Sequence, residues 1–363
     1  MNPKKICIVC PYPEGVAPSQ RLKYEQYSPY FKKNHWQVEI HSFQSLKLWN
    51  IVYKKGNLIH KILYTFLGYI NRIKLLFSLR QFDVVYIHLW VTPFGFAFFE
   101  WLYCLIAKKV VFDIDDLVFI DNTSTANSWI SKLKGKNKPI YLMKKANHVI
   151  TTTPYLVEFC KKYNANVTAI PPSLDGEIIF PNKKQKQHNQ IIIGWSGSHS
   201  TIKYLELVEA PIQNIGKKYD IDFLVFGVEK YQLNGVKIIC IPWNAQIEND
   251  VFNQMDIAIF PLHEDLWSKG KYGGKMIQYL AAGLPMIISD ANEIISSVIQ
   301  NEHDGIVVKN KNTDWELAFE KLITSSELRE KLSKNARTKF NNIFSIEANK
   351  NTYLNILNSV SEK

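Results

Sequence analysis

Three lysines and three glycines gather between residues 269 and 275, inside the segment EDLWSKGKYGGKMIQYLAAGLPMIISD (264–290). They are Lys269, Lys271 and Lys275 with Gly270, Gly273 and Gly274. Strand-like apolar runs at 256–261 and 285–289 flank the segment, which predicts a loop and a helix between two buried strands. Small residues leave backbone N–H groups approachable, and a helix N-terminus adds partial positive charge. The spacing favours an anion such as a diphosphate, and a solvated basic turn is the alternative.

Carboxylates gather in the run DIDD, where Asp113, Asp115 and Asp116 end or follow a predicted strand over 109–113. Ligands of doubly wound sheets lie at the carboxyl ends of strands, so we expect a functional role for at least one of them. The candidate roles are a base, a polar anchor for a sugar or a metal ligand. A cluster that caps a helix N-terminus is the structural alternative.

Two further loops of small residues follow predicted strands. Residues 5–11 form the first such strand, and the loop after it contains Gly15. A second strand over 191–195 leads into the loop 196–201, which holds Gly197 and Ser198, and then into a helix. A strand, a small-residue loop and a helix N-terminus together aim backbone amides at phosphate.

The elements that position these loops alternate between strands and helices in both halves of the 363-residue chain. A polar, lysine-rich stretch within 176–190 separates the halves and reads as a linker. We therefore predict an α/β protein with two doubly wound, Rossmann-like domains, over residues 1–175 and 176–344.

The formal net charge of +11 fits phosphorylated substrates, nucleic acid or an anionic membrane surface, and does not choose among them. Recognisable nucleic-acid-binding motifs do not accompany this charge, so we expect no nucleic-acid partner. Near the N-terminus, MNPKKICIVC, two lysines lead directly into a strand, without the long apolar core of a signal peptide, which predicts a cytoplasmic protein.

The segment 44–80 holds seven Lys or Arg, several aromatic residues and no Asp or Glu. From Leu58 onward its apolar spacing is helical, but the apolar run between Lys61 and Arg72 is too short to cross a bilayer. A basic amphipathic helix suits the inner face of the plasma membrane, as a peripheral contact. The alternative is a helix packed on its own domain with a solvated basic face.

Three segments resemble glycosyltransferases of the GT-B fold, of the group-one or family-four retaining type that builds bacterial surface polysaccharides. They are PYPEGVAPSQRLKYEQ near the N-terminus, IGWSGSHSTIKYL at the centre, and DIAIFPLHEDLWSKGKYGGKMIQYLAAGLPMIISD. The resemblance spans the whole chain and implies two Rossmann-like domains facing across a cleft. It also implies an N-terminal acceptor-binding domain, a C-terminal nucleotide-sugar-binding domain, and a last helix, about 345–363, that crosses back.

The resemblance assigns residues to roles. Asp113, or Asp115, matches the place where many relatives have a histidine near the donor sugar, and is the expected catalytic residue. The expected donor-binding residues are Gly15, Gly197, Ser198, Lys269, Lys271, Lys275, Gln278 and Tyr279. His88 and Arg21 are assigned to the acceptor or to another part of the site, with a histidine satisfied inside the sheet as the alternative for His88.

The chain departs from the family where two glutamates usually stand eight positions apart, because Gly270 and Gln278 occupy those places. Trp195 also stands at the usual arginine position of the central loop. We expect Lys271 or Lys275 to supply the missing positive charge. Fixed cations and amides would stabilise the departing diphosphate, so the resemblance implies no metal and no other cofactor.

The expected function is sugar transfer from a nucleotide-sugar donor to a glycan or lipid-linked acceptor, for O-antigen or capsule-type polysaccharide. The alternatives are a nucleotide-sugar epimerase, a glycan phosphorylase, or a non-catalytic sugar-nucleotide-binding protein of the same fold. Neither the sugar, the base, the acceptor nor the linkage follows from these motifs.

Overall fold

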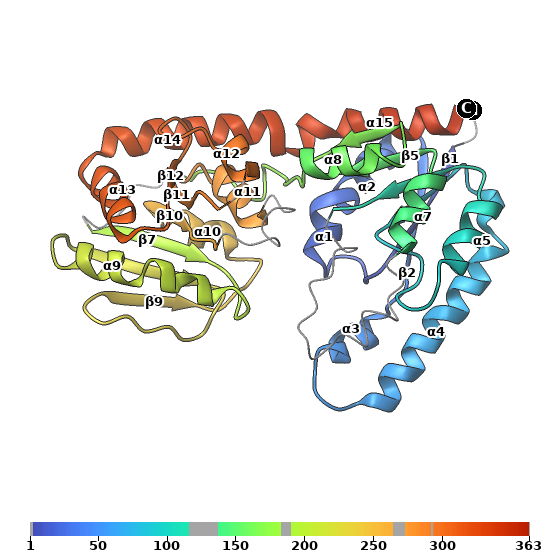
Figure 1. Ribbon diagram of the computed structural model, residues 1–363, viewed down its shortest axis with the longest axis horizontal. Coiled ribbons are helices and arrows are strands. Elements are labelled where there is room, and N and C mark those ends of the chain that lie inside the picture. The colour runs from blue at the N-terminus through green and yellow to red at the C-terminus, as the bar shows by residue number, and fades with distance from the viewer. Residues whose placement is uncertain (1–2, 116–136, 183–189, 264–272, 292, 363) are drawn as a thin grey trace. The chain divides into compact units, whose positions relative to one another are not determined.

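The computed structural model describes residues 3–115, 137–182, 190–263, 273–291 and 293–362 (Figure 1). The chain divides into two compact units. Unit 1 comprises 1–172 with 349–363, and unit 2 comprises 173–348. Each unit is built on a six-stranded parallel sheet, so the predicted α/β class with two doubly wound domains is confirmed.

The unit 1 sheet has the strand order β2-β1-β3-β4-β5-β6. Its central strands are fully buried runs of Val, Ile and Phe, as expected where helices cover both faces of a parallel sheet. The strands are β1 Lys4–Cys10, β2 Trp36–Ser42, β3 Val84–His88, β4 Val110–Asp113, β5 His148–Thr151 and β6 Val167–Ala169. The change of direction in this order lies between β1 and β3, where both strands end in loops.

Helices cover both faces of the unit 1 sheet. One face packs against apolar side chains of α4, α5, α7 and α8, including Leu75, Tyr103, Leu142 and Cys160. The other face meets α2 and α15. The helices are α1 Pro18–Gln20, α2 Gln26–Lys33, α3 Leu46–Val52, α4 Leu58–Leu76, α5 Phe98–Ile106, α7 Asn137–Lys145, α8 Pro154–Lys161 and α15 Ile346–Glu362. The helix predicted from Leu58 is α4.

The unit 2 sheet has the order β12-β11-β10-β7-β8-β9, which in chain order within the unit is the dinucleotide-binding arrangement 3-2-1-4-5-6. Its strands are β7 Ile191–Ser196, β8 Ile221–Phe226, β9 Lys237–Ile241, β10 Ile257–Phe260, β11 Met286–Ser289 and β12 Ile306–Val308. Its helices are α9 Glu209–Gly216, α10 Glu248–Phe252, α11 Gly274–Ala281, α12 Glu293–Val298, α13 Asn312–Thr324 and α14 Ser326–Lys339. The switch point lies between β7 and β10, so ligands of such a sheet meet the loops after these two strands.

Helices α4 and α15 are the long helices of unit 1, and neither is a candidate to span a bilayer. Among the described residues, no helix combines the length and the apolar character that a membrane span requires.

The last helix, α15, packs as part of unit 1 through an aromatic cluster. The ring of Tyr353 lies 4.6 Å from that of Tyr27 and 6.1 Å from that of Phe31, and all three are buried. Polar contacts lie on either side of this cluster, where the Tyr30 hydroxyl bonds to Asn351 and the Trp36 indole donates to Asn358. Residues from the end of the chain thus complete the core next to β1.

We predict that Tyr353→Ala lowers the free energy of unfolding of unit 1 by about 3 kcal/mol, because it removes a fully buried aromatic side chain and leaves a cavity. Urea unfolding followed by circular dichroism measures the change. Asn355→Ala, an exposed change on the same helix, serves as the control and should leave stability nearly unaltered. Equal effects of the two substitutions would show that α15 does not contribute to the core.

Candidate functional site

Two glycines of unit 2, Gly197 in the loop directly after β7 and Gly227 directly after β8, fit where other residues would clash. A Cβ atom on Gly197 would lie 1.9 Å from the Trp195 ring. A Cβ atom on Gly227, whose φ is +108°, would lie 1.8 Å from the Gly197 carbonyl oxygen. The Gly197 N–H donates to the Phe226 carbonyl at 2.8 Å, next to the end of β8. The loop is therefore held close to the sheet edge by contacts that only glycine allows.

Side-chain hydroxyl groups of α11 and of the loop itself hold the backbone of the loop after β7 in place. The buried Tyr279 hydroxyl of α11 accepts a hydrogen bond from the Ser196 N–H at 2.8 Å. The Thr201 hydroxyl accepts from the Ser198 N–H at 3.0 Å, and Ser198 Oγ lies 2.9 Å from Ser200 Oγ. Tyr279 was predicted to contact the donor, but its hydroxyl is buried beneath the loop and supports the backbone there.

Lys275 lies in the first turn of α11 and reaches the same loop. Its Nζ donates to Thr201 Oγ1 at 3.0 Å and lies 4.8 Å above the centre of the Trp195 ring. The described residues give Lys275 no carboxylate partner, and burial lowers its pKa to about 8. A partly buried ammonium without an acidic partner, beside a glycine loop and a helix N-terminus, is suited to binding an anion.

Gln278, one turn further along α11, takes part in a hydrogen-bonded group at the end of β9. Its Nε2 donates to Glu248 Oε1 at 3.0 Å. The Trp243 indole donates to the same oxygen at 3.3 Å and is 54% exposed. We did not predict Glu248 or Trp243, although an exposed tryptophan just after a strand of this sheet was a signal that the sequence contained.

Two of the predicted donor-binding lysines, Lys269 and Lys271, lie outside the described residues, as does the rest of 264–272. Their predicted roles stay predictions. Of the lysines in the organising segment, Lys275 is the one whose position the structure describes.

In unit 1, Gly15 occupies the loop after β1 with a φ of +79° and open space around its Cα. Its N–H donates to Glu25 Oε2 at 3.0 Å, while Gln20 Nε2 donates to the other oxygen of Glu25 at 3.0 Å. Burial raises the pKa of Glu25, despite these two hydrogen bonds. The loop geometry requires glycine here, and the Gly15 amide already has a partner within its own unit.

Asp113 lies at the end of β4 and is fully buried. Lys23 Nζ is 2.8 Å from its Oδ1, and Tyr86 donates to Oδ2 at 2.6 Å. His88 Nδ1 is 3.1 Å from the same Oδ2. Burial alone would raise the pKa of Asp113, but the charge of Lys23 and the hydrogen bond of His88 outweigh it and lower the pKa to about 2. The carboxylate is charged and enclosed, and it joins β4 to Lys23 and to the end of β3. Its expected catalytic role stays a prediction.

The other predicted residues of unit 1 surround this carboxylate less closely. His88 is buried at the end of β3, and its Nε2 has no hydrogen-bond partner among the described residues, so both its predicted place near the acceptor and the alternative stay predictions. Asp115 is half-buried, and its carbonyl accepts from the Thr152 hydroxyl at 3.4 Å. Arg21 is half-buried at the start of a π-helical turn, Arg21–Glu25, and its place next to an acceptor stays a prediction.

The sequence did not single out Lys23 or Tyr86 as partners of Asp113. A lysine in a predicted helix normally reads as a solvated side chain, and Tyr86 lies within a buried strand. The turn Arg21–Glu25 is kinked at Lys23, whose φ of −121° and ψ of −124° are not helical, and its side chain is buried in the core. This local irregularity has no signature in the residue pattern.

Among the described residues, no group of three or more His, Cys, Asp or Glu side chains is arranged to hold a metal ion. The Asp113 side chain is engaged by two cation-capable groups and a phenol, which is not a set of metal ligands. Asp116 lies outside the described residues.

Comparison with known proteins bears on the family and the fold. Residues 179–339 match the family Glycosyl transferases group 1. No protein of curated function matches the sequence.

Solved structures resemble the whole chain, and three of them illustrate the likeness. Sucrose-phosphate synthase from Thermosynechococcus elongatus has a TM-score of 0.71 at 12% identity, over 98% of each chain. A glycosyltransferase from Rickettsia africae has 0.70 at 14%, over 99% of each chain. HepE from Anabaena, in complex with UDP and glucose, has 0.66 at 12%, over 98% of this chain and 100% of that one. The predicted GT-B fold is confirmed.

The buried ion pair of Asp113 leads to a pH prediction. A carboxyl whose pKa is lowered on folding stabilises the protein above its unfolded pKa of about 3.9, and this stabilisation is lost as the pH falls toward the folded pKa. Asp113→Asn should therefore cost about 2 kcal/mol of unfolding free energy near pH 7, for a pKa lowered to about 2. Urea unfolding between pH 7 and pH 3 should show the gap between wild type and variant narrowing, whereas a constant gap would contradict the ion pair.

Proposed function

We propose that this chain, which has the GT-B fold and matches the family Glycosyl transferases group 1 over residues 179–339, is a glycosyltransferase that uses a nucleotide-sugar donor and a glycan or lipid-linked acceptor. The observation that carries the proposal is Lys275 beside the Gly197 loop, at the switch point of the unit 2 sheet. HepE, of the same fold, has been solved with UDP-glucose, which supports a nucleotide-sugar as the donor class.

The chemistry places positive charge where the leaving group becomes negative. As the bond between the anomeric carbon and the diphosphate oxygen breaks, charge builds on the diphosphate. Lys275, the α11 N-terminus and the backbone of the Gly197 loop would stabilise that charge. The acceptor hydroxyl oxygen forms the new bond, and the departing phosphate takes its proton. We propose retention of configuration by this front-face route, with no metal and no covalent enzyme intermediate.

In unit 1, we propose that Asp113 acts through its partners. Its carboxylate holds Lys23 and His88, from the helix after the Gly15 loop and from the end of β3. Asp115, half-buried next in the run, is the residue we propose to orient the acceptor hydroxyl if Asp113 stays enclosed during turnover.

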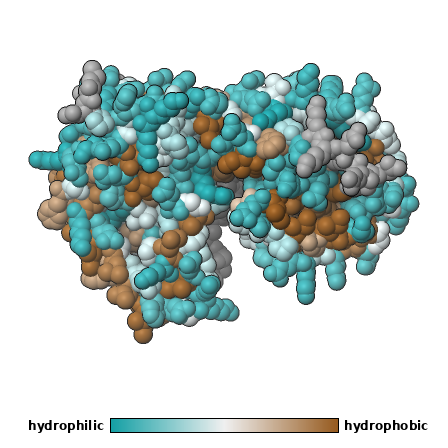
Figure 2. Space-filling model, turned by 180° about the vertical axis from the view of Figure 1, so that it is seen from behind, coloured by the Kyte–Doolittle hydropathy of each residue, from teal (hydrophilic) through white to brown (hydrophobic). Residues whose placement is uncertain are grey.

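We further propose that the protein works at the cytoplasmic face of the plasma membrane, in the assembly of a cell-surface polysaccharide. Helix α4 exposes a row of apolar side chains, Leu58, Ile59, Ile62, Leu63, Phe66 and Leu67, with Ile59 80% exposed. Figure 2 shows hydrophobic residues along the margin of unit 1 where this helix lies. The segment 44–80 around it is basic and free of acidic residues, which suits an anionic lipid surface.

We predict that a UDP-, GDP- or TDP-sugar raises the thermal midpoint of the wild-type protein, since a ligand that binds the native state stabilises it by about 2.7 kcal/mol at a hundredfold excess over Kd. Lys275→Ala should weaken donor binding about tenfold, because it removes a charge-assisted contact to the diphosphate. Lys217→Ala removes the same charge from an exposed position and should bind normally.

The same measurement at several pH values tests the role of the ammonium group. Burial lowers the pKa of Lys275 to about 8, so donor affinity of the wild type should fall as the pH rises above that value. Lys275→Ala should lose this dependence. A panel of nucleotide-sugars that leaves the midpoint unmoved at every pH would reject the donor site.

The membrane proposal predicts that neutralising Lys54, Lys55 and Lys61 together weakens binding to anionic vesicles by roughly a hundredfold, at ~1 kcal/mol for each basic side chain near the lipid. Cosedimentation with phosphatidylglycerol vesicles measures the change. Neutralising Lys144, Lys145 and Lys162, exposed elsewhere in unit 1, is the charge-matched control. Equal losses of vesicle binding in the two triple variants would reject the membrane contact and support the alternative, in which α4 only packs on its own domain.

A further inference from the structure

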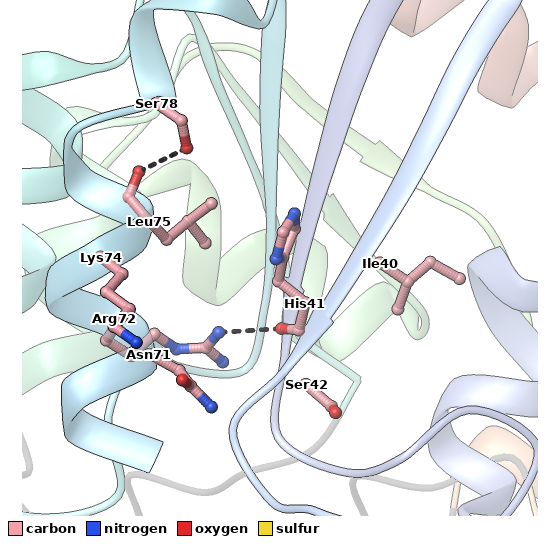
Figure 3. Close-up of a pocket in the computed structure, with 8 residues that line it drawn as sticks. All are labelled: Ile40, His41, Ser42, Asn71, Arg72, Lys74, Leu75 and Ser78. Carbon is pink, nitrogen blue, oxygen red and sulfur yellow. Dashed lines mark hydrogen bonds between the residues drawn. The ribbon is translucent and has the colours of Figure 1, made fainter. Parts of the chain in front are cut away.

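A cavity of about 430 Å³ lies in unit 1 between the carboxyl end of β2 and the second half of α4 (Figure 3). Its polar lining consists of His41, Ser42, Asn71, Arg72, Lys74 and Ser78. The lining contains hydrogen-bond donors from both elements and no carboxylate. None of these residues belongs to the donor site proposed in unit 2.

Arg72 is the fixed cation of this cavity. Its side chain is buried and donates to three backbone carbonyls, those of Val91, His41 and Cys10, at 2.8 to 2.9 Å. These carbonyls follow β3 or end β2 and β1, so the guanidinium joins the carboxyl ends of three neighbouring strands. A guanidinium has five N–H donors, and these three bonds leave two of them without a partner among the described residues.

The described residues provide no carboxylate partner for Arg72. Glu100 is close enough to act on it electrostatically, but the Glu100 carboxylate lies 3.6 Å from Lys138 Nζ and accepts the N–H groups of Val91 and Thr92. Buried charges in proteins are normally paired. Arg72 is a buried cation held by three carbonyl dipoles and the face of the Phe43 ring, 5.8 Å from the ring centre, with no carboxylate partner among the described residues. Such a cation in the wall of an open cavity is therefore suited to an anionic ligand.

The remaining lining residues match a tetrahedral oxyanion. Lys74 is exposed and forms no salt bridge among the described residues, and Figure 3 shows it extending from α4 together with Asn71 and Arg72. Burial, and then the charge of Arg72, lower the pKa of His41, so this imidazole is neutral at physiological pH. The opposing charge is Glu39, whose Oε2 lies 3.6 Å from His41 Nε2 but which does not line the cavity.

We propose that this cavity binds the phosphate group of a membrane lipid, with Arg72 as the fixed and Lys74 as the adaptable cation. Ile73 and Phe77, the latter 89% exposed, flank Lys74 on the same helix end and would contact the apolar part of such a lipid. The inference extends the proposed membrane association to a specific head-group site. The proposed lipid site does not depend on sugar transfer. A free phosphate would offer the same contacts as the phosphate of a lipid, so the experiments compare the two.

Two measurements test the proposal. NMR follows the ring signals of His41 while glycerol 3-phosphate is added, and cosedimentation measures binding to phosphatidylcholine vesicles that contain phosphatidic acid. We expect Lys74→Gln to weaken vesicle binding about fivefold more than Arg80→Gln. Arg80 is exposed, lies in the same basic segment and does not line the cavity. Equal weakening by the two variants would reduce the site to general electrostatic attraction and overturn the proposal.

A second pair of variants tests the cavity by charge reversal. Asn71→Asp places a carboxylate in the lining, whereas Asn50→Asp adds the same charge at an exposed position of α3. The first should abolish the phosphate response and the second should keep it. A His41 response to glycerol 3-phosphate identifies free phosphate as a ligand, and a loss confined to vesicle binding identifies the lipid. If neither probe distinguishes Asn71→Asp from Asn50→Asp, the cavity is not a phosphate site.

Discussion

The buried ion pair between Lys23 and Asp113 ties the first helical segment of unit 1 to the centre of its sheet. Buried charges are tolerated when they are paired and further hydrogen bonds satisfy them, and Tyr86 and His88 provide such contacts to the Asp113 carboxylate. Burial also holds the pKa of Tyr86 well above its ordinary value, so its hydroxyl stays a donor to the carboxylate.

Unit 2 holds its loop at the sheet edge without a buried ion pair among the described residues of that loop region. The Gly197 loop is shaped by steric fit against Trp195 and Gly227 and by the hydroxyls of Tyr279 and Thr201. Trp195 also gives Lys275 an aromatic face, since a ring quadrupole attracts a cation placed above it. Trp195 thus supports the lysine through its ring and supplies no charge itself.

The sequence predicted the architecture because it depends on patterns that repeat. Buried β-branched runs, glycine loops and helical spacing recur in both halves, and they placed β7, β10, α4 and α11 where the structure has them. The interior of the site was less predictable. Asp113 was expected at a ligand edge, which is where β4 ends, but its enclosure by Lys23 depends on a π-helical turn that no residue pattern marks. Tyr279 was likewise assigned to the donor by the resemblance, and no residue pattern marks that its buried hydroxyl accepts the Ser196 N–H.

Lys275 and Arg72 share one physical property, which distinguishes them from Lys23. Each is a cation in a partly or wholly desolvated position, and the described residues give neither a carboxylate partner. Desolvation lowers the pKa of both side chains, so each loses part of its affinity for a proton on folding. An arriving anion would restore that affinity and stabilise the folded unit at the same time. The two units would then each hold a phosphate at the carboxyl ends of a parallel sheet, one from a nucleotide-sugar and one from a lipid, by the same electrostatic means.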